Sequence, residues 1–196
     1  MIDEKDRARG RLFTHQSEIW LPRPRSEVFA FFSEPRNLET ITPAWLHFSI
    51  LTPQPIAMRP GAIIDYRLRL RGIPICWTTE ITAWEPPYRF VDVQRRGPYR
   101  VWVHEHTFEE RDGGTLARDR VDYKVPGGWP VQRLFVGRDV ERIFAYRRCV
   151  LAHWFGAASA EELRPCCDPA PSNAKSEPSA LRKDQRDDQG GIIPSV

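Results

Sequence analysis

Alternation between apolar and polar side chains dominates the first two thirds of the chain. The clearest case is residues 62–71, where four apolar side chains alternate with aspartate and arginine; these four are Ile64, Tyr66, Leu68 and Leu70. A two-residue period places the two sets on opposite faces, so this segment is predicted to be a half-buried β-strand. Similar patterns, interrupted by glycine and proline, predict further strands at residues 11–21, 46–51, 75–84, 88–94, 99–110 and 115–125.

Turn signals separate two pairs of these strands. Gly72 and Pro74 are predicted to form one turn, and the run Asp112-Gly113-Gly114 is a strong hairpin signal. The strands on either side of each turn are therefore expected to be antiparallel neighbours.

Helical patterns occur in three places. Residues 26–32 are predicted to form a short helix capped by Ser26, and a second short helix follows at about residues 33–41, capped by Ser33. Across residues 130–155, apolar side chains recur every three or four positions, which predicts one long amphipathic helix. Its predicted apolar face holds Val131, Leu134, Phe135, Val140, Ile143, Phe144, Leu151 and Trp154.

The order of these elements predicts an α+β fold. One strand is followed by two short helices, six further strands in a meander, and the long helix. A sheet with one apolar face must cover that face, and only the last helix is long enough to do so. We therefore expect a curved antiparallel sheet of about seven strands wrapped around the C-terminal helix, with a pocket between them.

Charge and composition exclude several classes of protein. Acidic and basic residues are mixed along the chain and leave a net charge of +3, which is not a nucleic-acid-binding pattern. The arginines at 67, 69 and 71 are predicted to lie on a solvated outer face of one strand. No apolar run approaches the length of a membrane span, and residues 1–10 do not form a secretory signal.

The cysteines indicate a reducing compartment. The four are Cys76, Cys149, Cys166 and Cys167. Their spacing fits neither a disulfide framework nor a paired zinc motif, so we expect a cytoplasmic protein.

The chain is predicted to divide into three parts. Residues 1–10 form an N-terminal extension, residues 11–160 the folded domain, and residues 161–196 a disordered tail. The tail is rich in proline and charge and contains no aromatic residue, so it cannot bury enough apolar surface to offset the entropy of ordering.

Removal of the tail is expected to leave the stability of the domain unchanged. Truncation after Leu163 should move the thermal midpoint by less than a few degrees, because residues 164–196 add little to the core. Thermal denaturation of both chains by circular dichroism tests this. A larger drop would show that the tail docks on the domain.

Two stretches carry a resemblance to a known superfamily. The first is FAFFSEPRNLE at residues 29–39, followed by ITP at residues 41–43. The second comprises Gly97-Pro98-Tyr99, then Trp102, His104, His106 and Phe108, and then Asp119, Val121 and Tyr123 at alternating positions. Together with the element order, these stretches resemble the SRPBCC or START-like (helix-grip) superfamily. The resemblance covers residues 11–155 and is strongest to the bacterial branch grouped with polyketide cyclase/dehydrase and lipid-transport domains.

The inward face of the sheet holds the candidate ligand-binding residues. In the strand at residues 99–110 either set of alternating side chains could face inward, and we expect the set with tryptophan and histidine to do so, because large aromatic groups gain most from burial. The expected binding residues are Tyr66, Leu68, Trp77, Asp92, Gln94, Trp102, His104, His106, Asp119, Tyr123 and Phe144. A β-bulge would reverse part of this assignment.

No catalytic or cofactor motif is present in the sequence. It contains no G-x-S-x-G elbow, no P-loop and no dinucleotide-binding glycine pattern. His104 and His106 would point to the same side of a strand, as two zinc ligands do, but a hydrogen-bonded pair is the simpler interpretation. We expect no metal and no cofactor.

Three functions remain open. The leading hypothesis is a binding protein for a small hydrophobic ligand, such as a lipid, an isoprenoid or an aromatic polyketide-like molecule. The second is a cyclase or dehydratase that uses His, Asp and Tyr side chains as acid and base. The third is a protein-interaction module with a vestigial pocket and an unknown partner. An inward-facing titratable cluster at an open pocket favours the enzyme, an apolar pocket the carrier, and a filled core the third hypothesis.

Overall fold

The computed structural model of the protein describes residues 11–157. The predicted N-terminal extension, the predicted tail and the cysteines at 166 and 167 lie outside the described residues.

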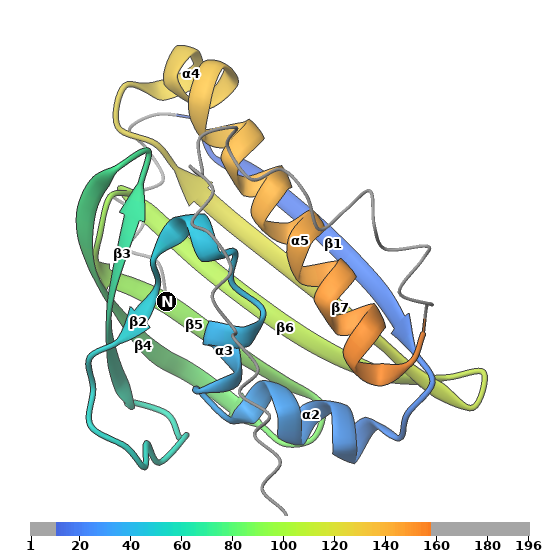
Figure 1. Cartoon of the computed structure of the whole chain (residues 1–196). Helices are drawn as coiled ribbons and strands as arrows, with labels where there is room; N and C mark the ends of the chain where they lie inside the picture. Colours follow the sequence, from blue (N-terminus) through green and yellow to red (C-terminus); the bar gives the residue numbers. More distant parts are fainter. Residues whose placement is uncertain (1–10, 158–196) are drawn as a thin grey trace, which may run out of the picture.

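Seven antiparallel strands form one sheet in the order β1-β7-β6-β5-β4-β3-β2. The strands are β1 (Phe13–Leu21), β2 (Ser49–Ile50), β3 (Ile63–Leu70), β4 (Ile73–Glu85), β5 (Arg89–Arg96), β6 (Val101–Arg111) and β7 (Gly114–Lys124). β2 to β7 follow one another as a meander, and β1 returns to pair with β7. The predicted α+β helix-grip architecture is confirmed: the sheet curves around the long C-terminal helix (Figure 1).

Two hairpins place the strands in register through residues with positive φ. At the β6–β7 turn, Asp112 and Gly113 have φ values of 51° and 74°, as a two-residue turn of type I′ requires. At the β3–β4 turn the corresponding residues are Arg71 and Gly72, with φ values of 51° and 83°. The prediction that Pro74 belongs to this turn is wrong. Pro74 lies within β4 and pairs with Arg69 of β3. The pairing of β4 with β5 begins only at Thr78, so no strand on that side of Pro74 requires a backbone N–H from it.

Two short helices lie on the face of the sheet that the C-terminal helix also covers, at one end of it (Figure 1). They are α2 (Arg25–Ser33) and α3 (Asn37–Thr40). Neither predicted cap forms. α2 begins one residue before Ser26, and Ser33 is its last residue, donating its hydroxyl to the carbonyl of Phe29 at 2.6 Å. The predicted strand at residues 46–51 is reduced to β2, because the chain first makes a 3₁₀ turn at Ala44–Leu46.

The C-terminal helix changes its pitch near its start. α4 (Gly128–Val131) leads into a π-helical turn at Gln132–Val136 and then into α5 (Gly137–Phe155). The wider turn shifts the phase of the helix, so the prediction that Leu134 and Phe135 belong to the buried face is wrong: they are 58% and 46% exposed. Trp154 is also exposed. α5 ends as predicted at Phe155, where Gly156 adopts the left-handed conformation of a C-cap.

A bulge in β4 changes which of its side chains face inward. The pairing with β5 shifts between Ile81 and Ala83, so that Ile81 and Trp84, three residues apart, both contribute to the inner side. Trp84 then contacts the rings of Phe29 and Phe90.

Two apolar clusters form the core at either end of α5. One joins α2 to the end of α5 and includes Val28, Phe31, Leu151 and Phe155. The other packs the start of α5 on β7 and includes Val121, Tyr123, Val125, Val140 and Phe144. Among the described helices, none is long and apolar enough to cross a membrane.

Candidate functional site

A cavity of about 180 Å³ lies between the sheet and α5. This volume is far larger than the roughly 10–15 Å³ that a single water molecule requires. Most of its wall is aromatic or aliphatic, from α2 and α3 to β3–β6 and α5. We call it the central cavity.

The structure places eight of the eleven predicted ligand-binding residues on the wall of the central cavity. They are Tyr66, Leu68, Trp77, Asp92, Trp102, His104, His106 and Phe144. The expected inward face of β6 is thus the one that carries Trp102 and both histidines. Whether these eight side chains contact a ligand remains a prediction.

The other three predicted residues lie off the wall. Gln94 donates its amide to the carbonyl of Tyr99 at 2.7 Å and so ties the end of β5 to the start of β6. Tyr123 packs in the cluster beneath α5, and its hydroxyl accepts a hydrogen bond from Gln132 at 3.4 Å. Asp119 lies behind the histidines and contacts both of them.

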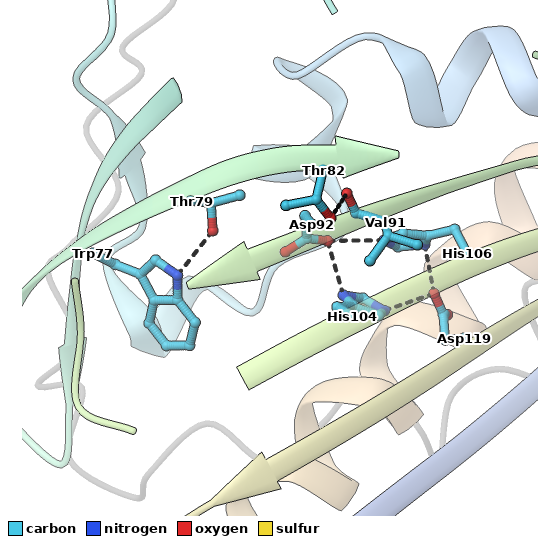
Figure 2. Close-up of polar contacts among 8 residues, drawn as sticks. All are labelled: Trp77, Thr79, Thr82, Val91, Asp92, His104, His106 and Asp119. Atoms are coloured by element: carbon cyan, nitrogen blue, oxygen red, sulfur yellow. Dashed lines mark hydrogen bonds and ion pairs between the residues drawn. The ribbon is translucent and has the colours of Figure 1, made fainter. Parts of the chain in front are cut away.

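Two histidines and two aspartates form a closed ring of polar contacts (Figure 2). The strand register creates it, because His104 lies opposite Asp92 of β5 and His106 opposite Asp119 of β7. On the cavity side, Asp92 Oδ2 lies 3.3 Å from His106 Nε2 and 3.5 Å from His104 Nδ1. On the other side, Asp119 Oδ1 lies 3.0 Å from His104 Nε2 and 2.7 Å from His106 Nδ1. We call these four residues the His–Asp cluster.

The contacts within the cluster differ in kind. His104 Nε2 donates a hydrogen bond to Asp119, which leaves the lone pair of a neutral His104 on Nδ1, on the side of Asp92. The shorter contact of His106 Nδ1 is poorly aligned for a hydrogen bond and acts mainly as charge attraction. The ring of His106 also stacks on Phe90 with centroids 4.1 Å apart.

Burial and neighbouring charges move the two histidine pKa values in opposite directions. Burial is the largest influence on His104 and, with the charge of His106, lowers its pKa. Burial also opposes protonation of His106, but its contacts with Asp119 and then Asp92 outweigh burial and raise its pKa. Burial acts to raise the pKa of Asp119, yet its contacts with His104 and His106 hold that pKa well below its usual range. The cluster therefore favours the neutral form of His104 and the protonated form of His106.

Comparison with protein families identifies the domain. The model of the family described as "Polyketide cyclase / dehydrase and lipid transport" matches residues 21–145. The chain belongs to this family. It is thereby a member of the SRPBCC/START-like superfamily that the sequence resembles. A comparison with curated proteins finds no match.

Solved structures of the same fold are distant in sequence. Protein Ms6760 from Mycobacterium smegmatis is 20% identical, with 74% of this chain and 91% of that one covered and a TM-score of 0.56. Ara h 8.0201 is 14% identical, with 76% and 100% covered and a TM-score of 0.55. Major latex-like protein 151 from Panax ginseng is 15% identical, with 74% and 98% covered and a TM-score of 0.52. At these identities the similarity establishes the fold.

In this member of the polyketide cyclase/dehydrase and lipid-transport family, the cluster also has the spacing of a metal site. Among the described residues, Asp92, His104 and His106 each bring one ligand atom to within 4.8 Å of the others. Contacts within the cluster account for this proximity without an ion. The expectation that no metal binds stays a prediction, which metal analysis of the purified protein tests.

One prominent wall residue of this family member was not predicted from the sequence. Arg147 of α5 is 8% exposed and lines the central cavity. The signal was its position, three residues after Phe144 and four before Leu151, where a buried helix face continues. Its charge argued against that placement, because arginine is seldom fully buried without a partner.

The raised pKa of His106 predicts that the protein loses stability as the pH rises above about 6.5. Its pKa in the folded state lies above the unfolded value of about 6.5, so its contribution is complete below that pH and is lost as pH rises through the folded pKa. The slope should reach at most about 1.4 kcal/mol per pH unit. The lowered pKa of His104 acts below this window, because there the unfolded chain binds the proton more readily.

Urea denaturation at several pH values above about 6.5 measures this slope. His106→Asn should flatten it, and His153→Asn, at an exposed position of α5, should not. An equal slope in wild type and His106→Asn would assign the pH dependence to another group.

Proposed function

We propose that the protein binds one small, largely apolar molecule in the central cavity. The observation that supports this most directly is the wall itself, which is mainly aromatic and aliphatic and is interrupted by a few convergent polar groups. Tyr66, Leu68, Trp77, Trp102 and Phe144 are proposed to supply the apolar contacts. His104, His106 and Asp92 are proposed to orient a polar group of the ligand.

Membership of the family is consistent with this proposal, because its description includes lipid transport. The alternative of a vestigial pocket is less favoured, since side chains do not fill the space between the sheet and α5. The ligand classes we favour are lipids, isoprenoids and aromatic polyketide-like molecules. We also propose that the protein acts in the cytoplasm without a nucleic-acid partner, on the basis of its cysteine content and mixed charge.

The uncharged fluorescent probe N-phenyl-1-naphthylamine tests for an apolar binding site. We expect saturable fluorescence enhancement with one site per chain. Ile143→Trp, on the cavity wall, should abolish binding by filling the space, whereas Leu134→Trp, on the exposed side of the helix, should preserve it. Absence of saturable binding to the wild type, together with no retained ligand in native mass spectrometry, would contradict the proposal.

A second candidate function, acid–base catalysis, is supported by the His–Asp cluster. Two titratable groups whose surroundings separate their pKa values are suited to act as base and acid. In both a cyclisation and a dehydration, His104 Nδ1 would remove a proton from the carbon next to a carbonyl, and the C–H electron pair would form the enolate. In a dehydration, the enolate would form a C=C bond as the C–O bond of a β-hydroxyl breaks, and His106 would protonate that hydroxyl, which leaves as water. In a cyclisation, the enolate carbon would attack a second carbonyl carbon of the ligand, and the oxygen of that carbonyl would take the proton from His106. Tyr123, the tyrosine among the predicted site residues, does not line the cavity and takes no part in this mechanism.

Exchange of α-protons in a model ketone tests this second candidate. In D₂O the protein is expected to accelerate deuterium incorporation into 2-tetralone, followed by mass spectrometry. His104→Asn should remove the acceleration while binding of the naphthylamine probe persists. Equal exchange with and without protein would exclude this chemistry for the probe and leave the binding function in place.

A further inference from the structure

Arg147 lies on the buried face of α5, where the neighbouring side chains are apolar. The buried stripe of the helix runs through Val140, Phe144, Arg147, Leu151 and Phe155, at spacings of four, three, four and four residues. The stripe faces the sheet, so the arginine side chain enters the interior, where it lines the central cavity.

Its guanidinium has no anionic partner within residues 11–157. No carboxylate oxygen of that part of the chain lies within the 4.0 Å of an ion pair, and Nε is buried without a hydrogen-bond acceptor. The guanidinium lies over the ring of Phe144, whose centroid is 4.9 Å from the guanidinium carbon. By contrast, Arg71 in the β3–β4 turn has an anionic partner. Two of its guanidinium nitrogens donate to the carboxylate of Asp139, near the start of α5, at 2.9 and 3.1 Å.

A guanidinium cannot relieve such burial by losing its proton, because arginine stays charged at any pH a protein tolerates. Burying a charge is costly unless a partner and hydrogen bonds compensate. The compensating anion must then come from outside the described domain, and the cavity is the space through which it can reach Arg147.

A hydroxyl on the opposite wall also lacks a partner. Tyr66 of β3 is buried and lines the cavity, and its hydroxyl makes no hydrogen bond within the described residues. Burial and then the charge of Asp92 raise its pKa, whereas the charge of Arg147 acts to lower it, so this hydroxyl lies within the electrostatic reach of the guanidinium. The guanidinium of Arg147 on α5 and the hydroxyl of Tyr66 on β3 are therefore two hydrogen-bond donors that line the same cavity.

We infer that the ligand of the central cavity is an amphipathic carboxylic acid whose carboxylate pairs with Arg147 and accepts a hydrogen bond from Tyr66. This inference rests on the proposed binding function. A carboxylate matches the guanidinium in charge and in its two-oxygen geometry. A phosphate dianion fits less well, because Asp92 lines the same cavity and repels the second charge. The apolar wall accommodates the alkyl or aromatic remainder.

Three ten-carbon probes that differ only in their head group test the inference: decanoate, decanol and decyl phosphate. Isothermal titration calorimetry of the full chain at neutral pH should give decanoate at least tenfold tighter binding than decanol and tighter binding than decyl phosphate. Arg147→Gln should remove the preference for decanoate and leave the affinity for decanol unchanged. Tyr66→Phe should reduce the preference several-fold. Arg138→Gln, at an exposed position of α5, should retain it.

The outcomes separate the inference from the function on which it rests. Binding of decanol and of the naphthylamine probe without a preference for decanoate would overturn the inference and keep the apolar site. A preference that survives in Arg147→Gln, or tightest binding of decyl phosphate, would also overturn it. If the naphthylamine probe and all three ten-carbon probes fail to bind, the proposed function itself fails. The wild-type preference and Tyr66→Phe keep the test decisive if Arg147→Gln folds poorly.

Discussion

Phe144→Ala is expected to lower the free energy of unfolding by about 3–5 kcal/mol. Phe144 is 2% exposed and packs with Val121, Val125 and Val140 beneath the start of α5. Its ring also contacts His15, with centroids 4.7 Å apart. Truncation to alanine removes this burial and leaves a void that joins the central cavity, so little relaxation can compensate.

Chemical denaturation of Phe144→Ala and Leu134→Ala measures the effect against a matched control on the same helix. Leu134 is 58% exposed, so its truncation should change the free energy of unfolding by no more than about 0.5 kcal/mol. Similar losses in the two variants would mean that the helix packs with the continuous apolar face predicted from the sequence. Phe144→Ala should also change the affinity for the naphthylamine probe, because the ring forms part of the cavity wall.

Asp119→Ala is expected to destabilise the protein by a similar amount, about 3–5 kcal/mol, because it leaves two buried histidines without their shared carboxylate. Asp92 Oδ2 still lies 3.3 Å from His106 and 3.5 Å from His104, but protonation of His106 loses the carboxylate that contributes most to it. The loss of stability with rising pH that is attributed to His106 should therefore also diminish in this variant.

Asp122→Ala is the matched control on the same strand. Asp122 lies on the outer face of β7, where it accepts a hydrogen bond from Thr14 at 2.6 Å and pairs with Arg120 at 3.3 Å. Surface pairs of this kind contribute about 0–1 kcal/mol. Asp119→Asn, which keeps an oxygen acceptor but removes the charge, should fall between the two alanine variants. A cost for Asp119→Ala no greater than that for Asp122→Ala would show that the cluster does not depend on this carboxylate.

The candidate site was predictable where one local rule was enough. Strand alternation placed Trp102, His104 and His106 on one face, and the gain from burying aromatic groups selected that face as the inner one. The same rule grouped Asp92 and Asp119 with the histidines. Strand alternation could not show that Asp92 lines the cavity whereas Asp119 does not. It gives the face of the sheet on which a side chain lies, but not how far that side chain is from the cavity.

Long-range packing decided the features that local patterns missed. The apolar spacing over residues 130–155 predicted one continuous helix, but the π-helical turn at Gln132–Val136 shifts its phase and exposes Leu134 and Phe135. Likewise, the bulge in β4 brings Trp84 to the inner side together with Ile81. Neither distortion has a strong local sequence signal, because each reflects a fit between elements that are distant in the chain.

The sequence by itself determined the order of the elements, the antiparallel meander, the long C-terminal helix and the family, because hydrophobic period, turn residues and short motifs are local properties. Only the tertiary structure decided that Asp92, His104, His106 and Asp119 close into one ring. It also decided that the Arg147 side chain lies on the cavity wall without an ion-pair partner among residues 11–157. The burial and pairing of a charge depend on residues brought together from several strands and a helix. The chemistry of the cavity therefore follows from how those elements pack, whereas the fold follows from the pattern along each of them.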